Sequence, residues 1–161
     1  MKKKAFLLER TGAMVINQYT LEELVVGQKE ILNSDVTCAD VEGFALLSGD
    51  ISPVHTSDEF AQSKGYTNRI AHGLLIGARI SALVGNKLPG AYGILQTFDL
   101  EFRSPLVPPE QIEIIGEVVN ISAGTGQVTL KIQVMNSGGK LIANCKARTI
   151  VHKPVPKTNP L

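Results

Sequence analysis

Asp50 and His55 lie five positions apart in the segment SGDISPVH. Carboxylates and imidazoles are among the side chains that most often take a proton from water or deliver one to a substrate. Pro53 lies between them, and the segment is too irregular for a strand or a regular helix. A loop of this kind can turn both side chains into one pocket. We therefore predict that Asp50 and His55 act on one bound water, without a decision on which residue is the acid.

Each of these residues also has a plainer interpretation. Gly-Asp is common in turns, so Asp50 is also explained as a turn residue. His55 is also explained as a surface residue just before a helix. His72, which precedes a long apolar segment, is expected to orient a loop rather than react.

Three helical segments are expected before residue 90. In residues 37–49, Thr37 and Asp40 form an imperfect capping box, and Gly49 suits the helix end. Residues 56–65 begin with a Thr56–Glu59 capping box. The third segment, residues 73–90, is apolar almost all round, which predicts a helix that is buried on most sides.

After residue 90 the hydrophobic period changes to two, which is typical of strands. Ile94, Gln96, Phe98, Leu100 and Phe102 are expected to share one face of the first strand. Further strands are expected over residues 111–121, 128–134 and 140–152, separated by the turn segments SAGTG and NSGGK, and another near 27–36. These elements predict an α+β domain in which an antiparallel sheet wraps around one apolar helix.

Three segments of the chain carry a resemblance to a known family: FALLSGDISPVH, FAQSKGYTNRIAHGLLIGARISALVG and LEFRSPLVPPEQIEI. Together they resemble the MaoC-like dehydratases of the hotdog fold, and within that family they are most similar to (R)-specific enoyl-CoA hydratases. The resemblance covers residues 20–152. It implies an antiparallel sheet around a long central helix, and an enzyme that adds water to trans-2-enoyl thioesters or removes it from (R)-3-hydroxyacyl thioesters. It implies no metal and no cofactor.

The resemblance also assigns roles to residues. The catalytic Asp and His of the family motif fall on Asp50 and His55. The backbone N–H of Gly73 is expected to face the thioester carbonyl of the substrate, where a donor at a helix start stabilises negative charge. Leu74 and Leu75, which follow on the apolar helix, are expected to line an acyl tunnel.

One residue departs from the family pattern. Ser52 stands where the family usually has Asn, between the Asp and the Pro of the motif. A hydroxyl has one donor where an amide has two. Ser52 is expected to contact the substrate site and to hold the loop by a single hydrogen bond to nearby backbone.

Composition excludes several classes of function. The net charge of +1 and the absence of Trp argue against nucleic-acid binding, and no run of apolar residues is long enough for a membrane span. His55, His72, Asp50 and His152 match no metal-binding spacing, so no metal site is expected. Cys38 and Cys145 are expected to be buried thiols of a cytoplasmic protein. The expected organisation is an N-terminal arm over residues 1–20, one hotdog domain over 21–153 and a tail over 154–161.

Two other functions remain open at this point. A hotdog acyl thioesterase usually has a carboxylate on the central helix, and Gly73 to Leu88 contains none. A non-catalytic subunit that binds acyl thioesters is the second alternative, favoured weakly by Ser52. The substrate carrier, CoA or acyl carrier protein, and the acyl chain length are left open. The family implies a homodimer, or a dimer of dimers, with each site at the interface between two subunits.

Overall fold

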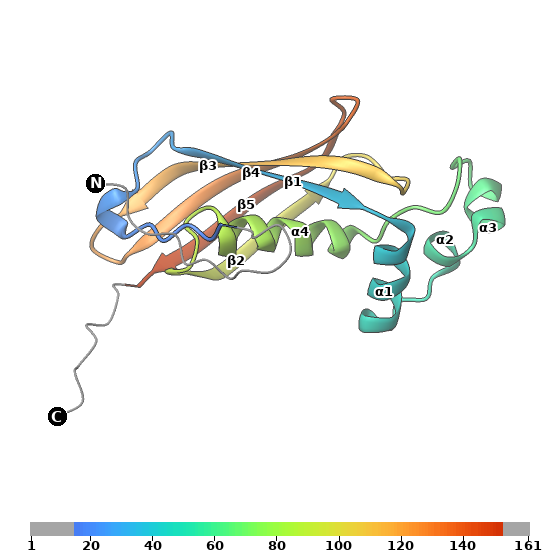
Figure 1. Ribbon diagram of the computed structural model, residues 1–161, viewed down its shortest axis with the longest axis horizontal. Coiled ribbons are helices and arrows are strands. Elements are labelled where there is room, and N and C mark those ends of the chain that lie inside the picture. Colours follow the sequence, from blue (N-terminus) through green and yellow to red (C-terminus); the bar gives the residue numbers. More distant parts are fainter. Residues whose placement is uncertain (1–14, 153–161) are drawn as a thin grey trace.

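A computed structural model of the 161-residue chain describes residues 15–152. One five-stranded antiparallel sheet, in the order β1-β3-β4-β5-β2, covers helix α4, and three shorter helices lie beyond one end of the sheet (Figure 1). The elements, in chain order, are η1 Leu21–Glu23, β1 Lys29–Val36, α1 Cys38–Ser48, α2 Pro53–Thr56, α3 Asp58–Ser63, α4 Gly73–Asn86, β2 Gly93–Phe102, β3 Glu110–Ser122, β4 Gln127–Asn136 and β5 Leu141–Val151. The predicted α+β class and antiparallel sheet are confirmed.

The strands follow the predicted segments closely. β3, β4 and β5 are joined by the two predicted turns, and their registers keep the alternation of apolar and polar residues on opposite faces. The segment near 27–36 is a real strand, β1, which pairs with β3 at one edge of the sheet. β2 pairs with β5 and forms the other edge.

The expected face of β2 is wrong at its beginning. The register of β2 against β5 shifts between Leu95 and Thr97, so Gln96 lies in a bulge. A bulge adds one residue and reverses the alternation before it. Leu95 therefore packs against the core, whereas Ile94 is 55% exposed. Phe98 and Leu100, after the bulge, pack against the core as expected.

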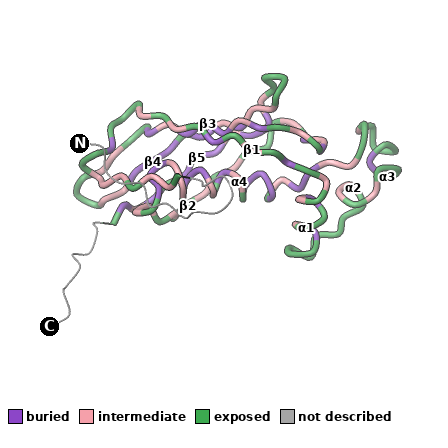
Figure 2. The backbone as a smooth tube through the Cα atoms, in the orientation of Figure 1, coloured by how far each residue is buried: buried purple, intermediate pink, exposed green. Residues whose placement is uncertain are grey.

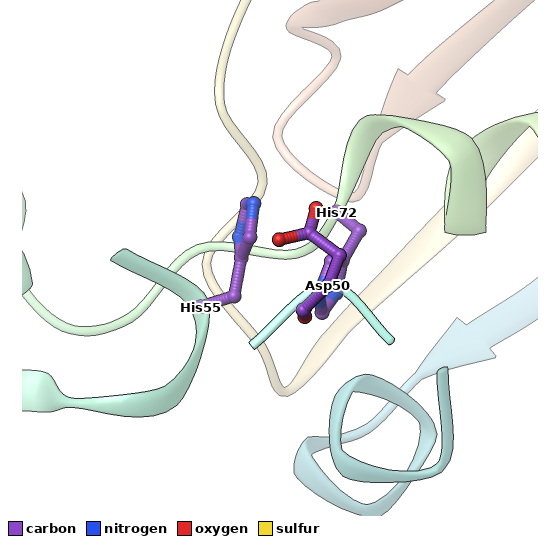
Figure 3. A group of neighbouring side chains, drawn as sticks. All are labelled: Asp50, His55 and His72. Atoms are coloured by element: carbon purple, nitrogen blue, oxygen red, sulfur yellow. The ribbon is translucent and has the colours of Figure 1, made fainter. Parts of the chain in front are cut away.

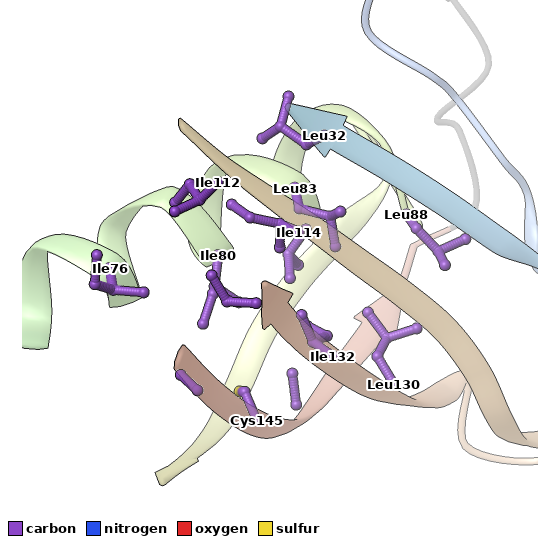
Figure 4. Close-up of a cluster of buried hydrophobic side chains, with 14 of the residues drawn as sticks. Leu32, Ile76, Ile80, Leu83, Leu88, Ile112, Ile114, Leu130, Ile132 and Cys145 are labelled. Atoms are coloured by element: carbon purple, nitrogen blue, oxygen red, sulfur yellow. The ribbon is translucent and has the colours of Figure 1, made fainter. Parts of the chain in front are cut away.

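The core lies between α4 and the inner face of the sheet (Figure 4). Ile80 and Leu83 of α4 are fully buried, together with Ile114 and Ile132 of the sheet. At Gly116 of β3 the helix comes so close that a Cβ atom there would lie 2.7 Å from Cδ2 of Leu83. A side chain at this position would force the Leu83 side chain to move.

Helix α4 is exposed along one side, so it is less completely buried than expected. It ends at Asn86 rather than near residue 90, and the burial pattern alternates along it (Figure 2). Leu74, Ala78, Ser81 and Gly85 form an exposed stripe along one side of it. The sheet covers the opposite face of the helix. The apolar composition of α4 therefore predicted more complete burial of the helix than the structure shows.

Polar caps define the small helices. Thr37 and Asp40 form the predicted capping box of α1, and Gly49 ends that helix with φ of 76°. The predicted second helix is two helices, because Pro53 begins the separate turn α2. The cap of α3 is Ser57, whose Oγ accepts from the N–H of Phe60, so the predicted Thr56–Glu59 capping box is wrong.

The beginning of the described chain is bonded to the domain. The N–H of Asn17 donates to the Asn86 carbonyl, and Gln18 forms a β-bridge with Gly90. Most of the predicted arm and tail lie outside the described residues. Within residues 15–152 no helix has the length and apolar character needed to cross a membrane.

Candidate active site

His55 lies on the single-turn helix α2, not on an irregular loop. Pro53 occupies the first position of that turn, where its missing N–H costs nothing. The Nδ1 atom of His55 lies 2.8 Å from the carbonyl oxygen of Ile70. A carbonyl only accepts, so Nδ1 carries the proton. In the neutral ring this leaves the Nε2 lone pair free to accept a proton from water.

Asp50 follows α1 in the exposed segment that leads to α2. One carboxylate oxygen, Oδ1, accepts from the backbone N–H of Ser52 at 3.1 Å, which is an Asx-turn. The carboxylate points toward His55 in Figure 3, and one oxygen lies within 4.8 Å of a ring nitrogen of that histidine. Asp50 therefore is a turn residue and also forms a pair with His55.

His72 joins the two residues. Its ring is 2% exposed, and its Nε2 donates to the backbone carbonyl of Asp50 at 2.9 Å. The ring also stacks on His55, with 3.9 Å between centroids and 28° between planes. No hydrogen-bond partner of its Nδ1 is found among the described residues.

The same three side chains lie close enough together for a metal site to be an alternative. One donor atom of each of Asp50, His55 and His72 lies within 4.8 Å of the others. Lone pairs lie in the plane of an imidazole, however, and the stacked rings direct theirs side by side rather than toward a common point. One nitrogen of each ring is already bonded to a backbone carbonyl. This geometry suits a water between Asp50 and His55 better than a tetrahedral ion.

A cavity of about 370 Å³ opens beside His55. Its walls come from α2, the segment before α4, the start of α4, the end of β2 with the loop after it, and β5. The lining residues are His55, Tyr66, Ile70, Ala71, Gly73, Ile76, Phe102, Arg103, Ser104, Pro105, Leu106 and Ile142. One apolar cavity thus connects the imidazole of His55 with the beginning of α4.

Gly73 is the first residue of α4, so its N–H has no acceptor within that helix. A Cβ atom at Gly73 would lie 2.5 Å from Cζ of Phe102, because the Phe102 ring packs directly on this glycine. A side chain at this position would displace the Phe102 ring. Gly73 lines the same cavity as His55.

Three expected substrate contacts are not found at the cavity. Leu74 is 67% exposed and Leu75 is 6% exposed within the core, and neither lines the cavity. Ile76 takes the place expected for them, because helix rotation turns that position toward the cavity. The hydroxyl of Ser52 makes no capping hydrogen bond, so the expected single bond is absent in the described chain. The loop is held instead by the backbone N–H of Ser52.

Several cavity residues were missed from the sequence. Tyr66 and Ile70 precede α4, and Arg103 to Leu106 follow β2. The N–H of Ala71 donates to the Leu106 carbonyl at 2.8 Å, which joins these two distant segments. These residues lie within the segments that carry the family resemblance. No local sequence pattern indicates that segments so far apart in the chain form one cavity wall.

Ion pairs attach the small helices to the rest of the domain. Arg79 of α4 binds Asp40 of α1 at 2.8 Å, and Arg69 binds Glu42 at 3.0 Å. The backbone N–H of Thr37, with further help from the Thr37 hydroxyl and Arg79, lowers the pKa of Asp40. These contacts hold the beginning of α1, and the Asp50 segment follows the other end of that helix.

Known proteins resemble the chain in sequence. The sequence profile of the MaoC like domain matches residues 23–138. A 3-hydroxybutyryl-CoA dehydratase of Methylorubrum extorquens is 39% identical over 62% of the chain, and the match spans 64% of that relative. An (R)-specific enoyl-CoA hydratase of Aeromonas caviae is 31% identical over 78% of the chain and 94% of its own length.

Solved structures agree with this result. The R-hydratase PhaJ1 of Pseudomonas aeruginosa superposes with a TM-score of 0.80 at 29% identity, covering 91% of this chain and 97% of that one. The (R)-hydratase of A. caviae gives a TM-score of 0.78 at 30% identity, covering 81% and 99%. The fold is the hotdog fold predicted from the sequence. The chain belongs to the MaoC-like domain family.

Proposed function

We propose that the protein is an (R)-specific enoyl-CoA hydratase, which adds water reversibly to trans-2-enoyl thioesters. One observation carries this proposal: the Asp50 carboxylate and the His55 imidazole lie within 4.8 Å of each other, and His55 lines the same cavity as Gly73. Hydration needs a base, an acid and a donor for the thioester oxygen, and these three groups provide them. The names of the relatives support the same reaction.

The proposed reaction uses one water between Asp50 and His55. One of the pair takes a proton from this water as its oxygen adds to the β-carbon of the enoyl group. The electrons move to the thioester oxygen, which accepts a hydrogen bond from the N–H of Gly73. The group that took this proton then gives it to the α-carbon, which completes the 3-hydroxyacyl thioester and returns the pair to its starting state. The reverse sequence removes water.

The direct test is hydration of crotonyl-CoA, followed by loss of the enoyl absorbance. We expect turnover by the wild-type protein, with (R)-3-hydroxybutyryl-CoA as the product in a stereospecific dehydrogenase assay. Release of free thiol in the same reaction would indicate the thioesterase alternative. No turnover, with tight binding of the thioester, would indicate a non-catalytic subunit. Activity that survives EDTA is expected, because no step uses a metal.

We also propose that the working form is a homodimer. Leu46, Leu47 and Ile51, which flank Asp50, are 86%, 83% and 71% exposed in the single chain. Leu74, next to Gly73, is 67% exposed. Apolar side chains grouped around a site mark a surface that another protein covers. A second copy that covers them would also close the open side of the site and separate the reacting water from bulk solvent.

Light scattering tests the dimer. Leu47→Asp is expected to give a monomer that has lost most of the hydratase activity. Val26→Asp is the matched control, since Val26 is 64% exposed but lies before β1, away from the site. A fully active monomer of the wild-type chain would contradict this proposal. The cytoplasmic location stays a prediction.

A further inference from the structure

His72 makes two different contacts with the two proposed catalytic residues. Its Nε2–H donates to the backbone carbonyl of Asp50 at 2.9 Å, across 22 residues of sequence. This bond ties the exposed segment that carries Asp50 to the buried beginning of α4. The other hydrogen bonds of that segment in the described chain are local, such as those of Asp50 with Ser48 and Ser52 and that of Thr56 with the Ile51 carbonyl.

The second contact is with the ring of His55. The two imidazoles stack with 3.9 Å between centroids, and His72 is held on another side by the Phe44 ring at 5.1 Å. His55 is bonded through Nδ1 to the carbonyl of Ile70, which leaves the ring free to swing about that bond. The stacked ring of His72 removes this freedom, so the Nε2 atom of His55 keeps one direction.

The second ring nitrogen of His72, Nδ1, is not explained by a role in packing alone. It is buried and has no hydrogen-bond partner among the described residues. A buried polar atom without a partner costs stability, which an apolar ring of similar size would avoid. The imidazole is therefore poorly suited to stability alone, and this points to a role in the site.

We propose that His72 is a positioning residue that holds both members of the Asp50–His55 pair. It fixes Asp50 by a hydrogen bond and His55 by ring stacking, and the two contributions are separable by mutation. The inference depends on the proposed hydratase function, since it concerns the rate of that reaction. His72 itself does not touch the substrate.

Two substitutions separate the contributions. His72→Phe keeps a ring for stacking but removes the donor, whereas His72→Gln keeps an amide N–H for the Asp50 carbonyl but removes the ring. Each is expected to lower kcat for crotonyl-CoA about tenfold, one decade of transition-state stabilisation. His72→Ala is expected to lose both contacts and to lower kcat more than tenfold but less than the product of the two single losses, because Asp50 and His55 act on one water. KM should stay within about twofold in all three, because the substrate contacts are unchanged.

Thermal unfolding of the same variants excludes a merely structural role. His72→Phe removes the unpartnered Nδ1, so its Tm should equal or exceed that of the wild type while its kcat falls. Ile114→Val, in the core, is the control that should lower Tm with unchanged kcat. Full activity of either His72→Phe or His72→Gln would overturn the proposal of two contributions, even if His72→Ala fails to fold.

Nuclear magnetic resonance tests the geometry independently of turnover. The chain has only three histidines, so nitrogen-15 spectra of their rings can be assigned by substitution. We expect His72 with its proton on Nε2 and His55 with its proton on Nδ1. A proton on Nδ1 of His72 would overturn the inference. If instead wild-type protein does not hydrate crotonyl-CoA, the proposed function has failed, and the inference fails with it.

Discussion

The core and the site are built in different ways. Between α4 and the sheet, Ile80, Leu83 and Ile114 are fully buried, and continuous strand pairing fixes their positions. The region from α1 to the beginning of α4 exposes Leu46 and Leu47 and consists of short helices (Figure 2). Helix caps, ion pairs and a few hydrogen bonds to backbone carbonyls hold that region together.

This difference separates stability from activity. Burial of apolar surface provides most of the free energy of folding, and it is concentrated in the core. Each polar contact around the site has a small net effect on stability, typically ~1 kcal/mol. The same contact decides where Asp50 or His55 points, however, so its effect on the rate can be larger. Substitutions in the two regions should therefore produce opposite results.

The largest expected effect on stability is in the core. Leu83→Ala should lower the free energy of unfolding by ~3 kcal/mol, because it leaves a cavity between α4 and β3. Enzyme that remains folded should keep nearly the kcat of wild type. Val26→Ala, at an exposed position away from the proposed dimer surface, is the control and should change the unfolding free energy little. Urea unfolding and the crotonyl-CoA assay measure both quantities. Equal losses for the two variants would contradict the comparison.

Substitutions of Ser52 test the region around the site, at the position where the sequence departs from the family pattern. Its hydroxyl makes no capping bond, so Ser52→Ala should be nearly neutral in both rate and stability. Ser52→Asn adds a side chain that can cap α2, the turn that carries His55. We expect it to raise kcat by up to roughly tenfold, or ~1.4 kcal/mol, with little change in Tm. Loss of activity in Ser52→Asn would show that the pocket is shaped for a different substrate.

A smaller effect is expected where the two regions meet, at Asp40. Hydrogen bonds from Thr37, with Arg79, hold the pKa of Asp40 in the folded state below its ordinary value of 3.8. The resulting stabilisation is present above the unfolded pKa and is lost as the pH falls through the folded pKa. Asp40→Asn should therefore lower stability at neutral pH by ~1 kcal/mol and should match wild type at the acid end. Unfolding curves from pH 7 downward measure this convergence, and parallel curves would contradict it.

The cysteines give the smallest effect and the simplest control. Burial, with a contribution from the charge of Asp99, raises the pKa of Cys145 to about 12. Cys38 is only partly buried, contrary to the expectation that both thiols are buried. A thiol reagent at neutral pH should label Cys38 in the folded protein and Cys145 only after unfolding. Rapid labelling of both would mean that the core opens readily.

Much of the core was predictable from sequence because its signals are local. Alternating residues in β3, β4 and β5 and the glycine-rich turns between them indicate strands wherever they occur. The bulge at Gln96 was missed, because it is set by pairing with β5 and not by the sequence of β2. The exposed side of α4 was missed for a related reason, since composition does not say how much of a helix a sheet covers.

The nearness of Asp50 and His55 was predictable from the sequence, but the other contacts of the candidate site were not. Asp50 and His55 were marked by type and spacing, and Gly73 by the family resemblance. The bond from His55 to Ile70 and the stack of His55 on His72 join positions that no periodicity relates. The sequence also does not indicate which side chains of α4 face the cavity, because this depends on the rotation of the helix. The structure places Ile76 there, and not Leu74 or Leu75.

The central claim is that Asp50 and His55 act as one unit, and a double-mutant cycle tests it most directly. Asp50→Ala and His55→Ala should each lower kcat for crotonyl-CoA at least ~100-fold, the usual contribution of an acid–base group. Tm should change little, because both residues lie outside the core. Since both act on one water, the double mutant should lose little more than either single mutant. Losses that multiply fully in the double mutant would contradict the account.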